Sequence, residues 1–509
     1  MSARTLMVQG TASSVGKSLL VTALCRYFKR MGLSVAPFKS LNMALNAHVT
    51  PDGFEIARAQ AVQAEACGIP ACVEMNPVLL KPEGDRKSQL VLLGRAQGSR
   101  SARALFSRGV ESREPIREVV LDALATLRAR HDLVLIEGAG SPAEINLRAR
   151  DIANMFVARA VKAPVLLAGD IDRGGVFAAF VGTLSLLEPE DRALVRGLVV
   201  NKFRGDLGLL QSGLDWLGAH TKLHVAGVLP HLGRLQIAEE DSLDVDARST
   251  NPSTRRGLAV CVLRLPRISN HDEFQPLEHE PDVDLVFSES PEAALAADLL
   301  IVPGSKSTVA DLAWLREQGL DHVIRLRAQR GRPVLGICGG CQMLGERIAD
   351  PLGVEAAQPL VEGLGLLALS TSFQPEKRTL SVRVRKAGPD TWLTARLPHD
   401  LEIPGYYIHA GVTEARSSVW HARLSGRAGA GETAAMDGAV SANGAVVGTM
   451  VHGLLEHDAL RHGLLAGLRA RRGLSAERGV AWDREAEYER LADAVETHLD
   501  TAFLRELTV

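Results

Sequence analysis

Short runs of Val, Leu and Ile recur along the chain, and each run ends in Gly, Asp or Pro before a segment with apolar residues at helical spacing. Such runs are typical of parallel strands buried on both faces, and the segments after them are typical of crossover helices. The pattern therefore predicts an α/β protein with two doubly wound domains. The expected strands are 5–8, 33–36, 133–136, 165–168, 198–200 and 225–229 in the first half, and 258–263, 283–287, 299–302 and 334–337 in the second.

A polar stretch separates the two halves. Residues 244–257 contain Pro252 and show no apolar period, which is typical of a linker. From about Glu456 onward Ala, Leu, Arg and Glu dominate, which indicates a terminal helical segment. We therefore expect domains over 1–251 and 252–455, followed by a helical C-terminal extension over 456–509.

Length, composition and charge narrow the class of protein. With 509 residues, and roughly 100 to 200 residues per domain, two or three domains are expected. Hydrophobic residues are 46% of the chain, too many for a mainly disordered protein. A formal net charge of −2 gives no positive field for nucleic acid or an anionic membrane, and 4% aromatic residues offer few base-stacking platforms. We expect no nucleic-acid partner and no membrane partner.

The start of the chain and the cysteines point to the cytoplasm. The N-terminal residues lack a basic segment followed by an apolar stretch and a cleavage site, and no apolar run approaches the roughly 18 residues that span a bilayer. The six cysteines are expected to be thiols rather than disulfides. Cys338 and Cys341 form a CxxC pair, but no second pair follows it, which disfavours a metal or redox site.

A glycine-rich loop, GTASSVGKS, follows the first expected strand and precedes a helical segment. In such a loop backbone N–H groups point at phosphate oxygens, a lysine neutralises charge and a hydroxyl can hold Mg²⁺. The first glycine lies one place earlier than in GxxxxGK[ST], as in dethiobiotin-synthetase-like P-loop proteins, which this stretch resembles. An incidental glycine-rich turn is the alternative. The expected nucleotide-binding residues here are Gly10, Thr11, Gly16, Lys17 and Ser18.

Carboxylates end two further strands of the first half. Glu137 follows the run 133–136, a position from which an acid can reach Mg²⁺ beside bound phosphates. Asp170 and Asp172 end another buried run, and they could be metal ligands, substrate contacts or caps of the next helix. We expect Ser18, Glu137 and Asp170 to form the metal site.

Two more strand ends carry candidate contacts. Asn201 and Lys202 resemble the start of the base-reading NKxD of GTPases, but position 204 is Arg, so the carboxylate that reads guanine is missing. We therefore expect ATP as the nucleotide, with Asn201 near its base. Lys39 could screen charge during phosphoryl transfer or could be an ordinary exposed lysine at a strand end.

Cys338 stands at a strand-to-helix turn of the second half, followed by two glycines. The glycines permit a strained turn, and a helix N-terminus favours a thiolate over a thiol. Cys338 is thus a candidate nucleophile, with a core cysteine as the alternative. Gly339 and, in the turn after another strand, Gly304 are the expected N–H donors to an oxyanion.

A thiol nucleophile needs a base that takes and returns its proton. His452 and His409 both follow apolar runs, and we favour His452 because it comes directly before a glycine. No third, orienting acid is evident from the sequence, and Glu456 is one candidate.

Together the halves resemble glutamine amidotransferases that join a class I glutaminase to an ATP-dependent ligase domain, and over nearly the whole chain the sequence is similar to the cobyric acid synthase family. The stretches that carry the resemblance are PFK at 37–39 with Asn42, Met43 and Asn46, EIARAQ at 55–60, MNPVLLKP at 75–82, EGAGSPAEINL at 137–147, DIDRGGVF at 170–177 and NKFRGD at 201–206.

The resemblance implies a glutamine-hydrolysing carbon–nitrogen ligase of cobalamin biosynthesis that uses ATP, Mg²⁺ and glutamine. It implies amidation of the b, d, e and g carboxylates of (adenosyl)cobyrinic acid a,c-diamide, which gives (adenosyl)cobyric acid. It also makes 1–251 the P-loop synthetase domain and 252–455 the class I glutamine amidotransferase domain. The candidate contacts of the corrinoid substrate are Lys39, Asn42, Asn46, Glu144 and Asn146.

Two other functions stay open. Cobyrinic acid a,c-diamide synthase has the same two-part plan but amidates different carboxylates, and the stretches at 75–82 and 170–177 argue against it. A non-catalytic P-loop switch with a degenerate glutaminase module would be expected to lack its nucleophile, whereas Cys338 is present. The departures from the family at Ser14, Cys341 and Tyr407 leave the candidate nucleophile and base unchanged.

Overall fold

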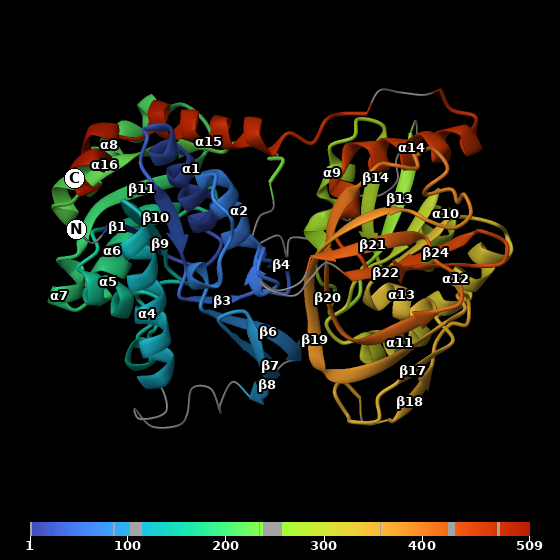
Figure 1. The fold of residues 1–509 in the computed structure, drawn as a ribbon. Coiled ribbons are helices and arrows are strands. Elements are labelled where there is room, and N and C mark those ends of the chain that lie inside the picture. Colours follow the sequence, from blue (N-terminus) through green and yellow to red (C-terminus); the bar gives the residue numbers. More distant parts are fainter. Residues whose placement is uncertain are drawn as a thin grey trace. The chain divides into compact units, whose positions relative to one another are not determined.

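The computed structural model describes residues 3–84, 87–101, 114–233, 235–237, 257–356, 358–425, 433–475 and 479–508. Their internal contacts divide the chain into two compact units (Figure 1). Within the described ranges, unit 1 comprises Met1–Ala44, Ile56–Asp241 and Asp483–Val509, and unit 2 comprises Leu45–Glu55 and Ser242–Trp482. Each unit is built on a parallel sheet of its own.

Unit 1 contains a six-stranded parallel sheet in the order β12-β11-β10-β1-β9-β2. Because β9 and β10 flank β1 on opposite sides and all three run parallel, the loops after them meet at the carboxyl edge of the sheet, where ligands bind in folds of this kind. The strands are β1 (Arg4–Gly10), β2 (Val35–Phe38), β9 (Leu133–Glu137), β10 (Val165–Asp170), β11 (Val195–Phe203) and β12 (His224–Pro230).

Helices cover both faces of this sheet, and buried apolar residues form one cluster on each side of it. The helices are α1 (Lys17–Arg30), α2 (Arg58–Cys67), α4 (Glu114–Arg130), α5 (Met155–Val161), α6 (Val176–Leu186), α7 (Pro189–Arg192), α8 (Leu207–Thr221), α15 (Arg484–His498) and α16 (Thr501–Thr508), with short 3₁₀ turns η1 (Val73–Met75) and η3 (Arg148–Arg150). A smaller four-stranded sheet joins β3 (Leu41–Met43), β6 (Val78–Gly84), β7 (Lys87–Leu92) and β8 (Arg95–Ser101).

The end of the chain packs on the first helix of unit 1, and Figure 1 shows α15 alongside α1. The guanidinium of Arg26 is buried between carboxylates of Glu485 and Glu489, and its Nε lies 2.7 Å from Glu489. Tyr488 donates a hydrogen bond to Glu65 on α2 at 2.9 Å. The helical segment expected after residue 456 is therefore divided, because α14 (Asp458–Arg472) belongs to unit 2 and the two helices after it belong to unit 1.

Unit 2 contains a second six-stranded sheet in the order β14-β13-β15-β16-β24-β23, parallel except for the edge strand β23. Its strands are β13 (Leu258–Leu263), β14 (Val283–Ser288), β15 (Leu299–Val302), β16 (Val334–Ile337), β23 (Ala439–Val440) and β24 (Val446–Thr449). Its helices before α14 are η5 (His271–Phe274), α9 (Gln275–Glu278), α10 (Pro291–Ala296), α11 (Thr308–Glu317), α12 (Leu320–Gln329), α13 (Gly339–Leu344) and η6 (Leu454–Glu456).

A further sheet of unit 2 has the order β18-β17-β19-β21-β22, and β20 also pairs with β19. Its strands are β17 (Arg347–Ala349), β18 (Leu360–Glu362), β19 (Leu369–Lys386), β20 (Ile403–Ala415), β21 (Trp420–Ser425) and β22 (Thr433–Asp437). A hairpin of β4 (Ala47–Val49) and β5 (Glu55–Ala57) carries most of the segment Leu45–Glu55, which lies in unit 2 although it comes early in the sequence.

The predicted fold class, two doubly wound α/β domains, is confirmed. The strand expected at 33–36 forms two residues later, because Gly32 in a left-handed conformation and the bond from Leu33 N–H to Phe28 C=O close α1 first. The linker expected at 244–257 lies outside the described residues except for Gly257. Within the parts of the chain that the structure describes, no helix is long and apolar enough to cross a membrane.

Candidate active sites

The glycine loop of unit 1 connects β1 to the N-terminus of α1, as the sequence predicted. Ser14 and Gly16 adopt positive φ angles of 58° and 90°, which turn the loop before the helix begins at Lys17. The Lys17 ammonium donates to the Ala12 carbonyl at 3.0 Å, so it lies over the loop. Backbone N–H groups at a helix N-terminus beside a lysine form a site suited to phosphate oxygens.

The end of β11 supports this loop. The Asn201 amide donates to the Val15 carbonyl at 2.8 Å, and Lys202 donates to the Ser14 carbonyl at 2.6 Å. A Cβ on Gly16 would overlap the Asn201 amide, so a glycine is required here for space as well as for its φ angle. Asn201 therefore stabilises the glycine loop through its hydrogen bond to Val15. Its expected contact with a nucleotide base stays a prediction.

Glu137 is the centre of a buried polar cluster at the carboxyl edge of the sheet. One carboxylate oxygen accepts hydrogen bonds from Ser18 and Lys39, each at 2.8 Å, and the other accepts from Gln63 at 2.6 Å. Glu137 is fully buried, and a buried carboxylate is tolerated only when it is paired and hydrogen-bonded. The alternative that Lys39 is an exposed lysine is wrong, since its side chain is buried in an ion pair with Glu137.

The same cluster fits the expected Mg²⁺ ion by the chemistry of its donors. Ser18 and Glu137 present a hydroxyl and a carboxylate oxygen within 2.8 Å of each other, and both are ligand types that Mg²⁺ prefers. Asp170, the third expected ligand, lies 3.0 Å from the Lys202 ammonium and accepts a hydrogen bond from the Asp172 N–H at 2.9 Å. Asp170 therefore pairs with Lys202, which in turn supports the glycine loop. The role of Asp170 as a metal ligand stays a prediction.

The expected substrate contacts lie in different places. Asn42 donates to Gln60 at 2.9 Å, and Gln60 in turn lies 3.5 Å from Glu137, so these residues extend the buried cluster. Glu144 and Asn146 are exposed in the loop after β9. Asn46 belongs to unit 2. Sequence reasoning did not single out Gln60 and Gln63, although the EIARAQ stretch that supports the family resemblance contains the first of them.

In unit 2, Cys338 occupies a strained turn between β16 and α13. Its φ of 50° and ψ of −111° lie where residues other than glycine are rare, as expected of a nucleophile presented at an elbow. Its N–H donates to the Thr449 carbonyl at 2.8 Å, which fixes the turn to the end of β24. A Cβ on Gly340 would overlap the Val302 carbonyl, so this close approach of β15 to the elbow requires glycine.

The structure completes a triad with a residue that the sequence did not reveal. His452 Nδ1 lies 2.9 Å from a carboxylate oxygen of Glu273, and the Gly453 N–H donates to the other oxygen at 3.0 Å. Glu273, on η5, is therefore the orienting acid, and the suggested Glu456 is not. Near Glu273 the sequence shows the polar stretch HDEF between two apolar strands. Nothing in that stretch indicates that Glu273 contacts His452, which is distant in the sequence.

The charges of the triad set the protonation of His452. Burial lowers the pKa of His452, but the negative charges of Glu273 and Cys338 outweigh this and raise it to about 10. These charges favour the protonated form of His452, the form that can give a proton to a leaving group. The other candidate base, His409, is also buried, and burial lowers its pKa to about 4, so it is neutral at pH 7.

Neighbouring residues restrict the position of the His452 ring. The Tyr406 ring stacks on it with centroids 5.4 Å apart and an angle of 19° between the planes. A Cβ on Gly304 would lie 3.1 Å from His452 Cε1, so no larger residue fits beside the ring without movement. The Gly304 carbonyl accepts a hydrogen bond from the Ser269 N–H at 2.9 Å, which orients that turn. The oxyanion role expected of Gly304 and Gly339 stays a prediction.

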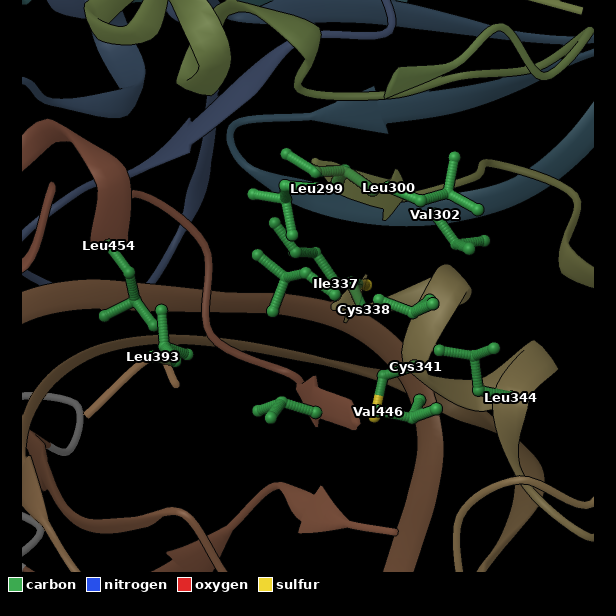
Figure 2. Packing of buried hydrophobic residues seen from close by; sticks show 14 of the residues in the cluster. Leu299, Leu300, Val302, Ile337, Cys338, Cys341, Leu344, Leu393, Val446 and Leu454 are labelled. Carbon is green, nitrogen blue, oxygen red and sulfur yellow. The ribbon is translucent and has the colours of Figure 1, made fainter. Parts of the chain in front are cut away.

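Cys341, the second residue of the CxxC pair, is part of the core. Figure 2 shows it with Cys338 at the start of α13, among buried residues of β15, β16 and β24. Cys341 Sγ packs closely against Gly448, because a Cβ added to that glycine would lie only 2.6 Å from the sulfur. Burial raises the pKa of the Cys341 thiol well above the usual value. Cys341 is therefore a neutral packing residue, distinct from the thiol that interacts with His452.

The two units define a class of enzyme in which a P-loop domain is joined to a glutamine amidotransferase domain with a Cys-His-Glu triad. Residues 6–245 match the family described as the CobQ/CobB/MinD/ParA nucleotide binding domain, and residues 259–460 match the CobB/CobQ-like glutamine amidotransferase domain. These matches cover both sites, and they are the domains of a glutamine-hydrolysing ligase.

Similar proteins extend over the whole chain. A cobyric acid synthase of Sorangium cellulosum (strain So ce56) is 55% identical over 99% of this chain and 98% of its own length. One of Dehalococcoides mccartyi (strain ATCC BAA-2266 / KCTC 15142 / 195) is 46% identical over 98% of this chain and 97% of its own. Among solved structures, PurLQS from Thermotoga maritima aligns with 41% of this chain and 98% of its own, with 18% identity and a TM-score of 0.30. The chain belongs to the cobyric acid synthase family.

Proposed function

We propose that the protein amidates the b, d, e and g carboxylates of (adenosyl)cobyrinic acid a,c-diamide to give (adenosyl)cobyric acid, with glutamine as nitrogen donor and ATP as activating substrate. The observation that carries this proposal is the Cys338–His452–Glu273 triad in a chain whose full-length relatives are cobyric acid synthases. We expect the reaction in the cytoplasm, where both substrates are available.

The first half-reaction releases ammonia from glutamine. The Cys338 thiolate attacks the side-chain amide carbon, and the charge that develops on oxygen is stabilised by the N–H groups of Gly339 and Gly304. The C–N bond then breaks as His452 donates its proton to the departing ammonia. The same histidine takes a proton from water, which hydrolyses the thioester to glutamate. Glu273 would keep Nδ1 of His452 protonated, so that Nε2 is the nitrogen that exchanges protons with the thiol and the ammonia.

The second half-reaction uses the ammonia. A carboxylate oxygen of the corrinoid attacks the γ-phosphorus of ATP, ADP leaves, and an acyl phosphate forms. Ammonia attacks the acyl carbon, inorganic phosphate leaves and the nitrogen loses a proton. The loop from Gly10 to Lys17 would hold the phosphates, and the Lys17 and Lys39 ammonium groups would offset negative charge during transfer.

The metal that assists this transfer would be held by Ser18 and Glu137, with Asp170 as a further candidate ligand. Mg²⁺ supplies charge neutralisation on the phosphates and holds them in line for displacement. Ser18 and Glu137 would exchange their mutual hydrogen bond for bonds to the ion. Lys39 and Gln63 already hold the carboxylate in place, so this exchange does not require Glu137 to find new supports.

The decisive experiment supplies the purified protein with ATP, Mg²⁺, glutamine and cobyrinic acid a,c-diamide and counts the amides formed by mass spectrometry. Four new amides are expected, with one ATP and one glutamine consumed for each. A parallel incubation with cobyrinic acid tests the alternative, cobyrinic acid a,c-diamide synthase, which would form two amides on that substrate and none on the diamide. Formation of no amide on either corrinoid would refute the proposed function.

A further inference from the structure

The hairpin segment, residues 45–55, contains β4, the turn after it and the first residue of β5. It comes from the P-loop half of the sequence, yet it packs within the glutaminase unit. The chain before it and after it belongs to unit 1, whereas Leu45–Glu55 belongs to unit 2. β4 pairs with β5, and the turn between them is closed by bonds between Thr50 and Phe54, of which the Thr50 N–H to Phe54 C=O bond is 2.8 Å. The segment is therefore an ordered element with defined contacts.

Apolar packing and an ion pair fix the hairpin to the sheet of unit 2 that contains β19 and β20. Ala47 and Val49 of β4 form a separate buried cluster with Tyr406 and Ile408 of β20. Glu55 at the start of β5 lies 2.7 Å from the Lys377 ammonium on β19, and the carboxylate is almost fully buried. A buried carboxylate with a lysine partner holds its place more firmly than an exposed pair would.

One side of the hairpin contacts the element that carries the triad acid. Asn270 Oδ1 accepts a hydrogen bond from the Ala47 N–H at 3.0 Å, and the Asn46 amide lies 3.1 Å from His271 Nε2. Asn270, the N-cap of η5, and His271, its first residue, lie within three positions of Glu273, and Asn270 has a left-handed φ of 54°. The hairpin thus holds the turn from which Glu273 reaches His452.

The other side of the hairpin contacts the residue that stacks on the triad base. The His48 ring packs edge-on against the Tyr406 ring, with centroids 5.3 Å apart. The opposite neighbour of Tyr406 is His452, which it also pairs with through backbone hydrogen bonds of 3.2 and 3.0 Å. The Tyr406 ring therefore contacts both His48 and the candidate base, His452.

We propose that residues 45–55 are a part of the glutaminase machinery, in which Asn46 and His48 are positioning residues that act through Glu273 and Tyr406. This inference rests on the proposed glutamine hydrolysis at Cys338. Neither residue touches the reacting atoms in this scheme. Their removal lets the acid and the base drift from the geometry that the thiol needs, and displacements of about 1 Å can cost up to roughly 100-fold in rate.

The test compares Asn46→Ala, His48→Ala and the double variant with the wild type, and measures glutamate released from glutamine. We expect kcat to fall about 10- to 100-fold for the double variant, while the KM for glutamine changes less than about threefold. His48→Phe keeps an aromatic edge against Tyr406 and should restore most of the rate lost in His48→Ala. Asp52→Ala, at an exposed position of the same hairpin, is the matched control and should match the wild type.

A second measurement separates this role from folding and from substrate binding. With ammonium chloride in place of glutamine, the variants should amidate the diamide at the wild-type rate, because that reaction bypasses the triad. If Asn46→Ala hydrolyses glutamine normally but loses ammonia-dependent amidation, Asn46 is a substrate contact and the inference is overturned. Normal glutamine hydrolysis by the double variant overturns it as well. A wild-type protein that hydrolyses no glutamine would instead refute the proposed function.

Discussion

The two sites differ in how their charged groups are engaged before substrate arrives. In the glutaminase site, His452 Nδ1 is already paired with Glu273, and the negative charges of Glu273 and Cys338 raise the pKa of His452, while its Nε2 has no hydrogen-bond partner among the described residues. In the P-loop site, Ser18, Lys39 and Gln63 all bond to Glu137, and the oxygens suited to a metal bond to each other. The acid and the base of the glutaminase site are already paired with each other, whereas the P-loop site must exchange protein hydrogen bonds for bonds to its ligands.

The charges explain this difference. A thiol and an imidazole can form an ion pair by moving one proton between them, so the triad carries its own counter-charge. A triphosphate brings several negative charges from outside, so its site must supply positive charge, and we expect Lys17 and Lys39 to supply it. Substitutions that separate the two half-reactions test this comparison most directly.

The largest effect is expected for Cys338→Ala. Loss of the nucleophile should lower glutamine-dependent amidation about a millionfold, to the background rate, because nothing replaces the thioester step. Ammonia-dependent amidation should remain at the wild-type level, as measured by amides formed on the diamide with ammonium chloride. Cys341→Ala is the control, and it should retain glutaminase activity because its thiol is a buried packing group. Glutamine-dependent activity surviving in Cys338→Ala would show that another residue is the nucleophile.

Glu273→Gln should lower kcat for glutamine hydrolysis about 10⁴-fold, since an amide supports the wrong ring tautomer. Glu273 helps to raise the pKa of His452 to about 10, so removing its charge lowers that pKa. The imidazolium is then lost at a lower pH, and the alkaline fall of kcat/KM should move to lower pH. The exposed Glu317→Gln on α11 serves as the control. An unchanged pH profile would contradict the triad.

Glu137→Gln tests the other site. Loss of the carboxylate removes the ion pair of the buried Lys39 and the proposed ligand of Mg²⁺, so amidation with either nitrogen donor should fall about 100- to 1,000-fold. Basal glutamine hydrolysis should persist within a few-fold. The matched control is Glu190→Gln, which changes an exposed carboxylate on α7. Full amidation activity in Glu137→Gln would remove Glu137 from the metal site.

The smallest effect is expected for Gly16→Ala, measured as the free energy of unfolding. A left-handed φ costs alanine about 1 kcal/mol, and the added methyl group would also overlap the Asn201 amide. Gly32→Ala is matched in φ, at 87° against 90°, but has nothing within 4 Å of the new methyl group. The Gly16 variant should therefore lose about 1 to 2 kcal/mol more than the Gly32 variant. Equal losses would show that Asn201 moves freely.

Local features of the sequence predicted the parts of the molecule that depend on neighbours along the chain. The glycine loop, the elbow at Cys338 and the buried strands follow from short patterns, because strand, turn and helix N-terminus are adjacent in sequence. The sheets around β3 and β19, which contain antiparallel strand pairs, were not predicted, because their strands are mixed in polarity and their pairing is set by partners far away.

The sequence by itself determined the fold class and the family, and it predicted Cys338 as nucleophile and His452 as base, since each of these depends on a continuous stretch of residues. Only the tertiary structure decided that Glu273 completes the triad, 179 positions from His452, and that Gln63 supports Glu137 from a distance of 74 positions. Only the tertiary structure also decided that residues 45–55 belong to unit 2, whereas the residues before and after them in the sequence belong to unit 1. A carboxylate shows its role only through what it is buried against, and burial is a property of the folded chain.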